Sequence, residues 1–321
     1  MIRNNWYAIL DSKQVPSHKL VGFRRLGENL VFWRDKQGMV HCYRDSCPHR
    51  GAALSKGKLI HDSIQCPFHG LEFNPQGNCT YIPSYGKNGV VPKAFHLTGY
   101  PLREKHGLIW LWFGDATDPL PPINFFPSLT GHDYSYAGFQ DHWKTHYSRA
   151  VENQLDVVHL PFVHHNTIGA GNRRLVDGPI AEWDERDGDL LNLWVFNRVD
   201  DGTPPKKSSE LSKPEGHPSL QFRFPNTWQN WISDDFRVFI AFVPVDEENT
   251  ILYIRNYQRS LRIPIFRSVV NTLSLIGSWV IERQDKRVVE TQVPLRTYYR
   301  MPEILIRGDS PIVLYRKRRA L

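Results

Sequence analysis

Two short loops decide the fold of this chain: Cys47-Pro48-His49-Arg50-Gly51 and Cys66-Pro67-Phe68-His69-Gly70. Each loop offers one thiol and one imidazole, and 16 residues separate His49 from Cys66. The prolines restrict the backbone of each loop, and the glycines let it approach a bulky group closely. A ligand pattern that occurs twice in the same order indicates a metal site.

Three interpretations of these loops compete. Two reduced cysteines beside two surface histidines can arise by coincidence, and a structural zinc ion uses the same ligand types. However, a Cys-x-His spacing is tight for one tetrahedral ion, because two or more residues usually lie between neighbouring zinc ligands. Two irons bridged by sulfide remove the difficulty, since each loop then gives its cysteine to one iron and its histidine to the other. This mixed ligation, by Cys47, His49, Cys66 and His69, is that of a Rieske [2Fe–2S] cluster.

The residues around the loops form short β-type runs separated by turns. Asn29–Arg34 and Met39–Arg44 flank a Lys-Gln-Gly turn, which predicts a hairpin. Further strands are expected at 64–66, 71–73 and 78–82, and an apolar strand at 107–113 is expected to close the unit. No helical periodicity interrupts this region, so the sequence predicts a small all-β domain over residues 1–115.

A proline-rich linker follows at 118–127, and residues 116–321 are expected to form a second domain. The helical spacing of Tyr147, Val151, Leu155 and Val158 predicts a helix over 144–160 that ends or kinks at Pro161. A last helix is expected at about 266–290, and strands at 190–196, 220–224, 228–232, 237–243 and 250–258. The second domain is therefore expected to be α+β, an antiparallel sheet with helices near its two sequence ends.

The helix predicted before Pro161 carries a second set of polar residues. Glu152, Asp156 and His159 recur at i, i+4 and i+7, so they would share one helical face. His164 follows beyond the proline, and a kink there would let His159 and His164 bind one metal ion. One more carboxylate would complete a 2-His-1-carboxylate triad, which suits Fe(II) and leaves positions open for O2.

Asp285 on the last helix is the predicted third ligand. It shares one face with Ile281 and Val288-Val289, whereas Glu282 and Lys286 are expected to point elsewhere. A carboxylate on an apolar stripe is costly unless it is paired or bound to a metal.

Other assignments stay open at this point. Asp285 can instead pair with Arg283 or Arg287 near the surface, and Glu282 or Glu290 would be the next candidates for the third ligand. His165, next to His164, is not expected to be a ligand.

Together the two motifs resemble those of the terminal oxygenase component of the Rieske non-haem iron oxygenases. The resemblance covers nearly the whole chain: the two Cys/His loops, the Asp-x-x-His-x-x-x-x-His pattern of 156–164 with the preceding Asn153, and the stretch 284–290. One departure is Leu71, which stands where many relatives have Trp. The size of the chain suggests the homotrimeric subgroup, which includes O-demethylases and single-component aromatic hydroxylases.

The resemblance implies a helix-grip fold for the second domain, one [2Fe–2S] cluster and one mononuclear Fe(II) per chain, and O2 as co-substrate. Asp156 would bridge its own His159 and His69 of the partner subunit, and Asn153 would lie beside the iron. The implied activity is hydroxylation or demethylation of an aromatic or other apolar small molecule. Alternatives are a cis-dihydroxylating dioxygenase, a Rieske electron-transfer protein without catalysis and, as an outsider, a zinc-binding regulatory protein.

Electrons are expected to come from a separate protein. Gly169-Ala170-Gly171 begins a dinucleotide motif, but Arg174 occupies the place of the third glycine. NAD(P)H would therefore act only indirectly, through a reductase or ferredoxin. Such carriers are often acidic, which suits the net charge of +7 from 40 basic and 33 acidic residues.

Composition limits the remaining classes. Without an apolar export signal a cytoplasmic protein is expected, so the two other cysteines, Cys42 and Cys79, are interpreted as buried packing residues. The apolar stretch Ser268–Ile281 is too short to span a membrane. Nucleic-acid binding has no support, since the one dense basic run, Arg316–Arg319, is interpreted as a solvated tail or an inter-subunit contact.

Two features concern the substrate. The polar segment 200–218 is expected to be a flexible loop and is a candidate lid over the substrate entrance. Six aromatic residues are candidates for lining an apolar pocket, with ordinary core packing as the alternative for each: Phe162, Trp194, Phe222, Phe224, Trp228 and Trp231.

Overall fold

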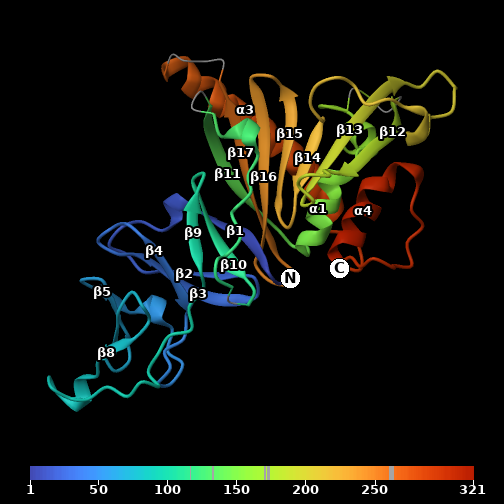
Figure 1. Ribbon diagram of the computed structural model, residues 1–321. Coiled ribbons are helices and arrows are strands. Elements are labelled where there is room, and N and C mark those ends of the chain that lie inside the picture. The colour runs from blue at the N-terminus through green and yellow to red at the C-terminus, as the bar shows by residue number, and fades with distance from the viewer. Residues whose placement is uncertain (116, 132–133, 170, 172–173, 260–263) are drawn as a thin grey trace. The chain divides into compact units, whose positions relative to one another are not determined.

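The computed structural model describes residues 1–115, 117–131, 134–169, 171, 174–259 and 264–321, with the backbone alone described for 264–267. The chain divides into two compact units, residues 1–120 with 243–246 and residues 121–242 with 247–321 (Figure 1). The short segment 243–246 groups with the first unit because Leu26 and Gly27 donate backbone hydrogen bonds to the carbonyl groups of Pro244 and Val245. The sequence predicts the domain boundary after residue 115, because local sequence pattern does not report such a long-range contact.

The first unit contains strands and short 3₁₀ turns, and the part of it that the structure describes has no α-helix. Its strands are β1 (Asn5–Asp11), β2 (Val21–Arg25), β3 (Glu28–Arg34), β4 (Val40–Arg44), β5 (Lys58–Ile60), β6 (Ser63–Gln65), β7 (Glu72–Phe73), β8 (Cys79–Tyr81), β9 (Leu102–Lys105) and β10 (Leu108–Phe113). They form three antiparallel sheets, in the orders β1-β10-β9, β2-β3-β4 and β5-β6-β7-β8. The predicted all-β character is confirmed.

The apolar strand β10 joins the two ends of the first unit. It pairs with β9 on one side and with β1 on the other, where Trp6 lies opposite Trp112. Its buried residues explain the continuous apolar run at 107–113, since both faces of this strand are covered. The partner β1, at the opposite end of the segment, was not predicted.

The second unit is built on one antiparallel sheet of seven strands in the order β11-β17-β16-β15-β14-β13-β12. The strands are β11 (Ser135–Trp143), β12 (Arg174–Trp183), β13 (Leu190–Val199), β14 (Leu220–Arg223), β15 (Thr227–Ser233), β16 (Phe236–Pro244) and β17 (Thr250–Gln258). The helices are α1 (Tyr147–Leu155), α2 (Leu160–Val163), α3 (Pro264–Val289) and α4 (Ser310–Arg319). The predicted α+β class is confirmed, whereas β11, β12 and α4 were not predicted.

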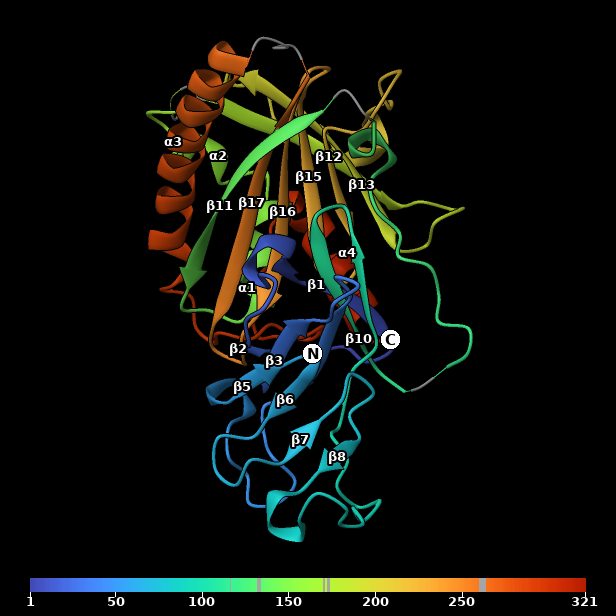
Figure 2. The same ribbon diagram turned by 90° about the vertical axis from the view of Figure 1, so that its left-hand side faces the viewer.

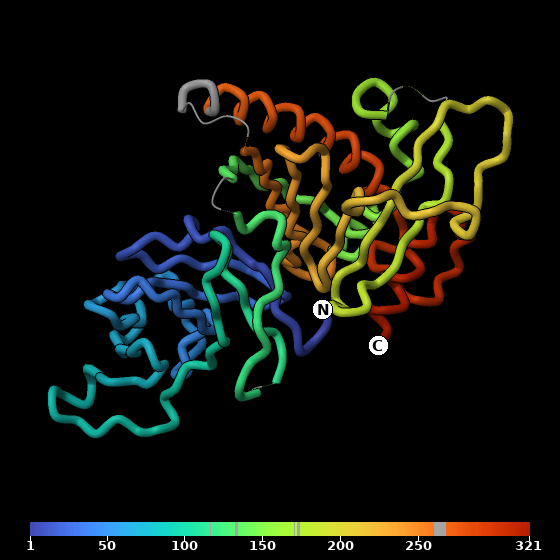
Figure 3. The backbone as a smooth tube through the Cα atoms, turned by 45° about the horizontal axis from the view of Figure 1, so that its top comes forward, coloured from blue at the N-terminus to red at the C-terminus, as the bar shows by residue number. Residues whose placement is uncertain are grey.

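The helices pack on the sheet and on one another. The long helix α3, unbroken in Figure 3, contacts β11, β17, α1 and α2, and α4 contacts β12 and α1. In Figure 2 the strands β17, β16 and β15 lie in front, with α1 and α4 behind them. Residues of this sheet and of the helices α1, α2 and α3 line the cavity that contains His159, His164 and Asp285.

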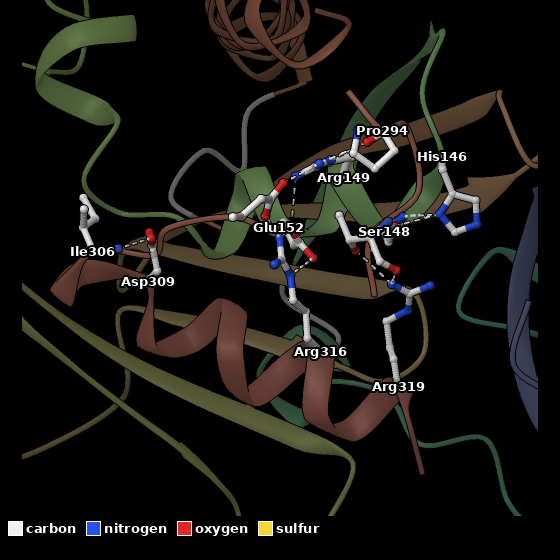
Figure 4. A network of polar contacts seen from close by, with 11 residues as sticks. His146, Ser148, Arg149, Glu152, Pro294, Ile306, Asp309, Arg316 and Arg319 are labelled. Atoms are coloured by element: carbon white, nitrogen blue, oxygen red, sulfur yellow. Dashed lines mark hydrogen bonds and ion pairs between the residues drawn. The ribbon is translucent and has the colours of Figure 1, made fainter. Parts of the chain in front are cut away.

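A buried ion network joins α1 to α4 (Figure 4). Arg316 on α4 donates two hydrogen bonds, of 2.9 and 2.7 Å, to the Glu152 carboxylate on α1, and Glu303 also pairs with Arg316. Arg149 pairs with Glu303 at 2.7 Å. The interpretation of 316–319 as a solvated tail or subunit contact is therefore wrong for Arg316, because a buried acidic residue far away in sequence neutralises it.

Candidate metal centres

The two Cys/His loops of the first unit have the same backbone construction. In each, the cysteine carbonyl accepts a hydrogen bond from the glycine four residues later, Gly51 on Cys47 and Gly70 on Cys66. Both glycines have positive φ angles, +75° and +72°, which other residues rarely adopt. The glycine of each loop is thus required by the turn, and the two turns present equivalent cysteine and histidine side chains.

The loops bring like ligands together. The Nδ1 atoms of His49 and His69 are 3.2 Å apart, and the thiols of Cys47 and Cys66 are close enough to interact. Yet among the described residues no three of these four side chains converge within 4.8 Å, as a single ion would need. A cysteine pair on one side and a histidine pair on the other fit two irons better than they fit one zinc ion.

The two ligand pairs differ in exposure. Cys47 and Cys66 belong to the hydrophobic core of the first unit, whereas His49 and His69 are exposed. Burial, together with the neighbouring Cys66, raises the pKa of the Cys47 thiol to about 11. The Cys47 thiol in this apolar core does not ionise readily by itself, and a bound iron–sulfur cluster would stabilise its thiolate form.

In the second unit the chain leaves α1 before it reaches the predicted ligands. The helix ends at Leu155, and Asp156 has extended backbone angles, φ −76° and ψ 119°. Its Oδ1 atom accepts backbone hydrogen bonds from Val158 and His159, a turn that competes with helix. The prediction that Glu152, Asp156 and His159 share one helical face is therefore wrong.

Pro161 starts a helix instead of ending one. It lies in the first turn of the short helix α2, where its missing N–H group costs nothing. His159 precedes α2 as its N-cap, and His164 follows as its C-cap. One helical turn therefore separates the two histidines, and this brings their side chains to the same place, with ring centres 5.2 Å apart.

The structure brings His159, His164 and Asp285 together as a possible metal site. Asp285 Oδ1 lies 3.4 Å from Nε2 of His159 and 3.0 Å from Nε2 of His164. Despite these distances Oδ1 is buried and accepts no hydrogen bond of acceptable geometry. One ligand atom from each of the three residues lies within 4.8 Å of the others, so the residues fit a mononuclear iron.

Neighbouring side chains orient His164 and Asp285. Gln284 Oε1 accepts a hydrogen bond of 2.8 Å from Nδ1 of His164, which leaves the Nε2 lone pair free. Gln154 donates to the other carboxylate oxygen of Asp285 at 3.3 Å. Asp156 Oδ1 lies 3.7 Å from Nδ1 of His159. The supporting role of Gln154 and Gln284 was missed, because it depends on contacts across more than 100 residues of sequence.

Opposite charges stabilise one another in this site. Burial alone would raise the pKa of Asp285, but the contacts with His159 and His164 outweigh it and lower the pKa to about 2. Burial alone would lower the pKa of His159, but Asp156 and Asp285 raise it to about 9. A carboxylate so buried keeps its charge only beside positive charge, which a bound cation supplies as well.

Two of the alternatives for the third ligand, surface pairing of Asp285 and Glu290, gain no support from the structure. Asp285 is 2% exposed and contacts the two histidines, which excludes surface pairing with Arg283 or Arg287. Glu290 accepts a hydrogen bond from the backbone of Lys144 instead. His165 is exposed, and its Nδ1 atom contacts the Phe162 carbonyl.

The position of Glu282 shows that the predicted orientation of α3 is wrong. It was expected to point away from the apolar stripe, yet it is 5% exposed and lines the same cavity as Asp285. Positions three apart on a helix are neighbours just as positions four apart are, so the buried stripe passes through Glu282, Asp285 and Val289, while Val288 is partly exposed. Burial, with Asp285 and Asp141 nearby, raises the pKa of Glu282 well above its ordinary value.

A cavity of about 320 Å³ opens beside the three residues. One wall is the sheet, where Trp228, Asn230 and Ile232 alternate along β15 and Val238 and Ile240 lie opposite on β16. The other wall consists of residues from the helices and from the turn at 156–159, including Asn153, whose Nδ2 atom is buried without a hydrogen-bond partner in the described part of the chain.

Of the six aromatic candidates, Trp228 alone lines this cavity. Phe162 is 65% exposed, Phe222 packs against Tyr315, and Trp231 stacks on His217. The alternation of strand residues explains this outcome, because Trp231 faces the opposite side of β15 from Trp228. Ordinary packing was the better interpretation for most of them.

The segment 200–218 lies against β12. The Lys206 carbonyl accepts a hydrogen bond from the Gly178 N–H group, and the Lys206 N–H group donates to the Asp177 carboxylate. The Ser208 hydroxyl donates to the Pro179 carbonyl. None of its residues lines the cavity in the described structure, so the lid interpretation gains no support. Of the dinucleotide-like stretch 169–174, Ala170, Asn172 and Arg173 lie outside the described residues.

Two family models match the chain. A model of the Rieske [2Fe-2S] domain matches residues 5–101, and a model of the vanillate O-demethylase oxygenase C-terminal domain matches residues 143–320, more than half of the 321 residues. The chain belongs to the Rieske non-haem iron oxygenases. In this Rieske oxygenase chain the first model covers both Cys/His loops, and the second covers His159, His164 and Asp285.

Relatives agree with this assignment. Protein TIC 55 of the pea Pisum sativum is 32% identical over 206 residues, which are 62% of this chain and 36% of the relative. The iron–sulfur subunit TsaM1 of the toluene-4-sulfonate monooxygenase system of Comamonas testosteroni is 32% identical over 200 residues, which are 61% of this chain and 56% of the relative. The chain thus spans about a third to just over half of the length of these relatives.

A solved structure shows the same fold. The crystal structure of dicamba monooxygenase bound to dicamba superposes with a TM-score of 0.76 at 21% identity, covering 100% of this chain and 97% of the other.

Two further predictions for this Rieske oxygenase chain concern its other cysteines and membrane-spanning segments. Cys42 and Cys79 are buried free thiols, as predicted, and Cys79 contacts the Tyr81 carbonyl. Among the described helices, none combines the length and the apolarity needed to cross a bilayer.

Proposed function

We propose that this chain is the terminal oxygenase of a multicomponent Rieske system. It would use O2 and electrons from a separate reductase or ferredoxin to hydroxylate or demethylate an aromatic or other apolar small molecule. The observation that carries the proposal is the position of His159, His164 and Asp285 in the wall of a largely apolar cavity of about 320 Å³. A ligand set of this kind at a substrate-sized cavity supports catalysis over electron transfer alone.

In the proposed function, Cys47, His49, Cys66 and His69 hold the [2Fe–2S] cluster, and His159, His164 and Asp285 hold the Fe(II). When bound, the cluster transfers single electrons and the mononuclear iron activates O2. The protein contributes orientation: Gln284 holds the ring of His164, and Gln154 holds the Asp285 carboxylate. The apolar cavity walls exclude water and place a substrate beside the site.

The exposed rings of His49 and His69 are the proposed place where electrons enter or leave the cluster. The net charge of +7 favours an acidic donor, so reduction should slow as salt is added. We further propose a cytoplasmic homotrimer, in which Asp156 bridges its own His159 and His69 of the partner subunit. Its Oδ1 lies 3.7 Å from Nδ1 of His159, longer than a hydrogen bond, and this proximity supports the intrachain half of the proposed bridge.

The test measures oxygen incorporation. The reconstituted protein is supplied with a surrogate reductase and ferredoxin, a panel of methoxylated and unsubstituted aromatic compounds, and ¹⁸O-labelled O2. We expect substrate-dependent O2 consumption and a product carrying one labelled atom, or loss of a methyl group as formaldehyde. A cis-diol carrying two labelled atoms would support the dioxygenase alternative. Reduction and reoxidation of the cluster without any substrate-dependent O2 consumption across the panel would contradict the proposal.

A further inference from the structure

The cavity contains a buried carboxyl group that the metal site does not use. Glu282 lies on α3 one turn before Asp285, so its Cα is about 4.5 Å along the helix axis from that residue. The side chain lines the cavity, only 5% of it is exposed, and Oε2 has no hydrogen-bond partner among the described residues. Glu282 is also absent from the group of residues whose ligand atoms converge on one point.

An unpartnered carboxyl group in such a place is costly. Burying a polar group without a hydrogen bond destabilises the folded protein, so the carboxyl group of Glu282 contributes nothing to stability there. No lysine or arginine lines the cavity in the described structure, and the two histidines that line it, His159 and His164, lie beside Asp285 in the metal site. A carboxyl group in these surroundings is the neutral acid, and the neutral acid is a hydrogen-bond donor.

The residues that line the cavity also limit which substrates it can bind. Among the described residues, a substrate carboxylate or sulfonate would meet no lysine or arginine in the cavity, while Asp156 and Asp285 already offset the charge of a divalent ion in the metal site. The apolar residues of β15, β16 and α3 suit an uncharged molecule. Such a molecule can satisfy Glu282 only if it carries a hydrogen-bond acceptor.

We propose that Glu282 is the specificity-determining residue of this cavity, and that it donates a hydrogen bond to a carbonyl, ether or hydroxyl oxygen of an uncharged substrate. This inference rests on the proposed oxygenase function, because it takes the cavity beside the metal ligands as the substrate site. It narrows the substrate class to neutral molecules with one acceptor oxygen. Anionic aromatic acids are excluded from the class.

The test compares four probes of similar size: acetophenone, ethylbenzene, benzoate and benzylammonium. Their dissociation constants are measured by equilibrium dialysis against the iron-loaded, anaerobic protein, so no turnover is needed. We expect acetophenone to bind about five- to tenfold more tightly than ethylbenzene, the gain that one net hydrogen bond provides. Benzoate and benzylammonium should bind more weakly than acetophenone.

Two variants assign the effect to Glu282. In Glu282→Gln the amide still donates a hydrogen bond, so the preference for acetophenone over ethylbenzene should persist. In Glu282→Met the preference should vanish, and the thermal midpoint should rise because an unsatisfied buried polar group is gone. The matched control Ile281→Val, a neighbouring cavity residue, should change the binding of both probes by the same factor.

Three results would overturn the proposal: an acetophenone preference that survives in Glu282→Met, tightest binding of benzoate or benzylammonium, or a lower thermal midpoint for Glu282→Met. The last result would mean that the fold already satisfies the carboxyl group. Failure of the oxygenase proposal would appear separately, as absent substrate-dependent O2 consumption in a protein that still binds the probes selectively.

Discussion

Gln284 shows how one residue outside the ligand set controls the metal site. Its Oε1 atom accepts hydrogen bonds from His164 Nδ1 at 2.8 Å and from the Thr167 hydroxyl at 2.9 Å, and its own amide donates to Asn166. A histidine that donates from Nδ1 must present its Nε2 lone pair, which is the form that binds a metal. Gln284 therefore selects the tautomer and the ring orientation of His164.

Replacing Gln284 tests this role. Gln284→Leu should weaken Fe(II) binding at the mononuclear site by about 10- to 100-fold, the usual effect of losing the partner of a metal-bound histidine. The control Gln284→Glu keeps an acceptor oxygen and should retain most of the affinity. Both affinities can be measured by competition with a chelator under anaerobic conditions. An unchanged affinity in Gln284→Leu would show that His164 needs no partner.

Asp156 is a second residue outside the ligand set, and its proposed role is in electron transfer. Asp156→Asn keeps an oxygen that can accept from the backbone of Val158 and His159, so the turn and both metal sites should persist. It lacks the negative charge needed to accept from two imidazoles, so turnover coupled to O2 consumption should fall by at least two orders of magnitude. Single-turnover kinetics with a pre-reduced cluster measure this directly. A fully active variant would refute the bridging role.

At the scale of elements, local pattern predicted most strands but misplaced the helices around the metal site. The apolar spacing of Tyr147, Val151, Leu155 and Val158 continues past the real end of α1 at Leu155. The chain leaves the helix because the Asp156 side chain binds the following backbone N–H groups, and Pro161 then begins α2. The predicted ligands still meet, since a turn followed by one helical turn brings His159 and His164 together as a kinked helix would.

Three of the elements that were missed, β1, β11 and α4, depend on distant partners. The strand β1 pairs with β10, and β11 pairs with β17, over separations that no local pattern reports. Helix α4 has a basic C-terminal half that resembles a solvated tail. It is held in the fold because Arg316 meets Glu152 across more than 150 residues of sequence.

The Glu152–Arg316 pair is therefore expected to stabilise the second unit. Glu152→Gln should cost about 3 kcal/mol of unfolding free energy, because it leaves a buried guanidinium only partly neutralised. The matched control is Glu303→Gln in the same network. The Glu303 side chain is 28% exposed against 6% for Glu152, so its loss should cost clearly less. Urea unfolding followed by circular dichroism measures both; equal costs would contradict the argument from burial.

At the scale of the whole molecule, stability should depend on pH through His146. This residue lies at the start of α1, where Nδ1 accepts a hydrogen bond from the backbone of Ser148. Burial, together with Arg319 and Arg296, lowers the pKa of His146 to about 3, while the carboxylate of Glu247 lies 3.6 Å from Nε2 without raising it. The folded protein thus holds this imidazole neutral at a pH where the unfolded chain protonates it.

The direction in which stability changes with pH follows from the difference in proton binding between the folded and unfolded states. Below the unfolded pKa of about 6.5, the unfolded chain gains a proton that the folded protein refuses, so stability falls as the pH falls from 6.5 toward 3. Between pH 7 and pH 5 the wild type should lose about 2 kcal/mol more than His146→Asn, which keeps a helix-capping side chain but does not titrate. Urea midpoints of both proteins at the two pH values test this. Parallel losses would show that His146 is not responsible.

The sequence predicted the division into an all-β part and an α+β part, since both rest on local periodicity and on motifs with tight spacing. The cluster residues came from two loops of five residues each, which the fold preserves as equivalent turns. The place of Glu282 in the cavity could not be predicted, because it depends on which side of α3 the sheet covers.

Metal analysis tests the central claim, two metal centres in one chain, most directly. After anaerobic reconstitution with Fe(II) and sulfide, the wild type should contain about three irons and two acid-labile sulfides per chain. Asp285→Ala should contain about two irons and two sulfides, with the visible absorption of the cluster unchanged. A wild type with only two irons, or with zinc and no sulfide, would contradict the account.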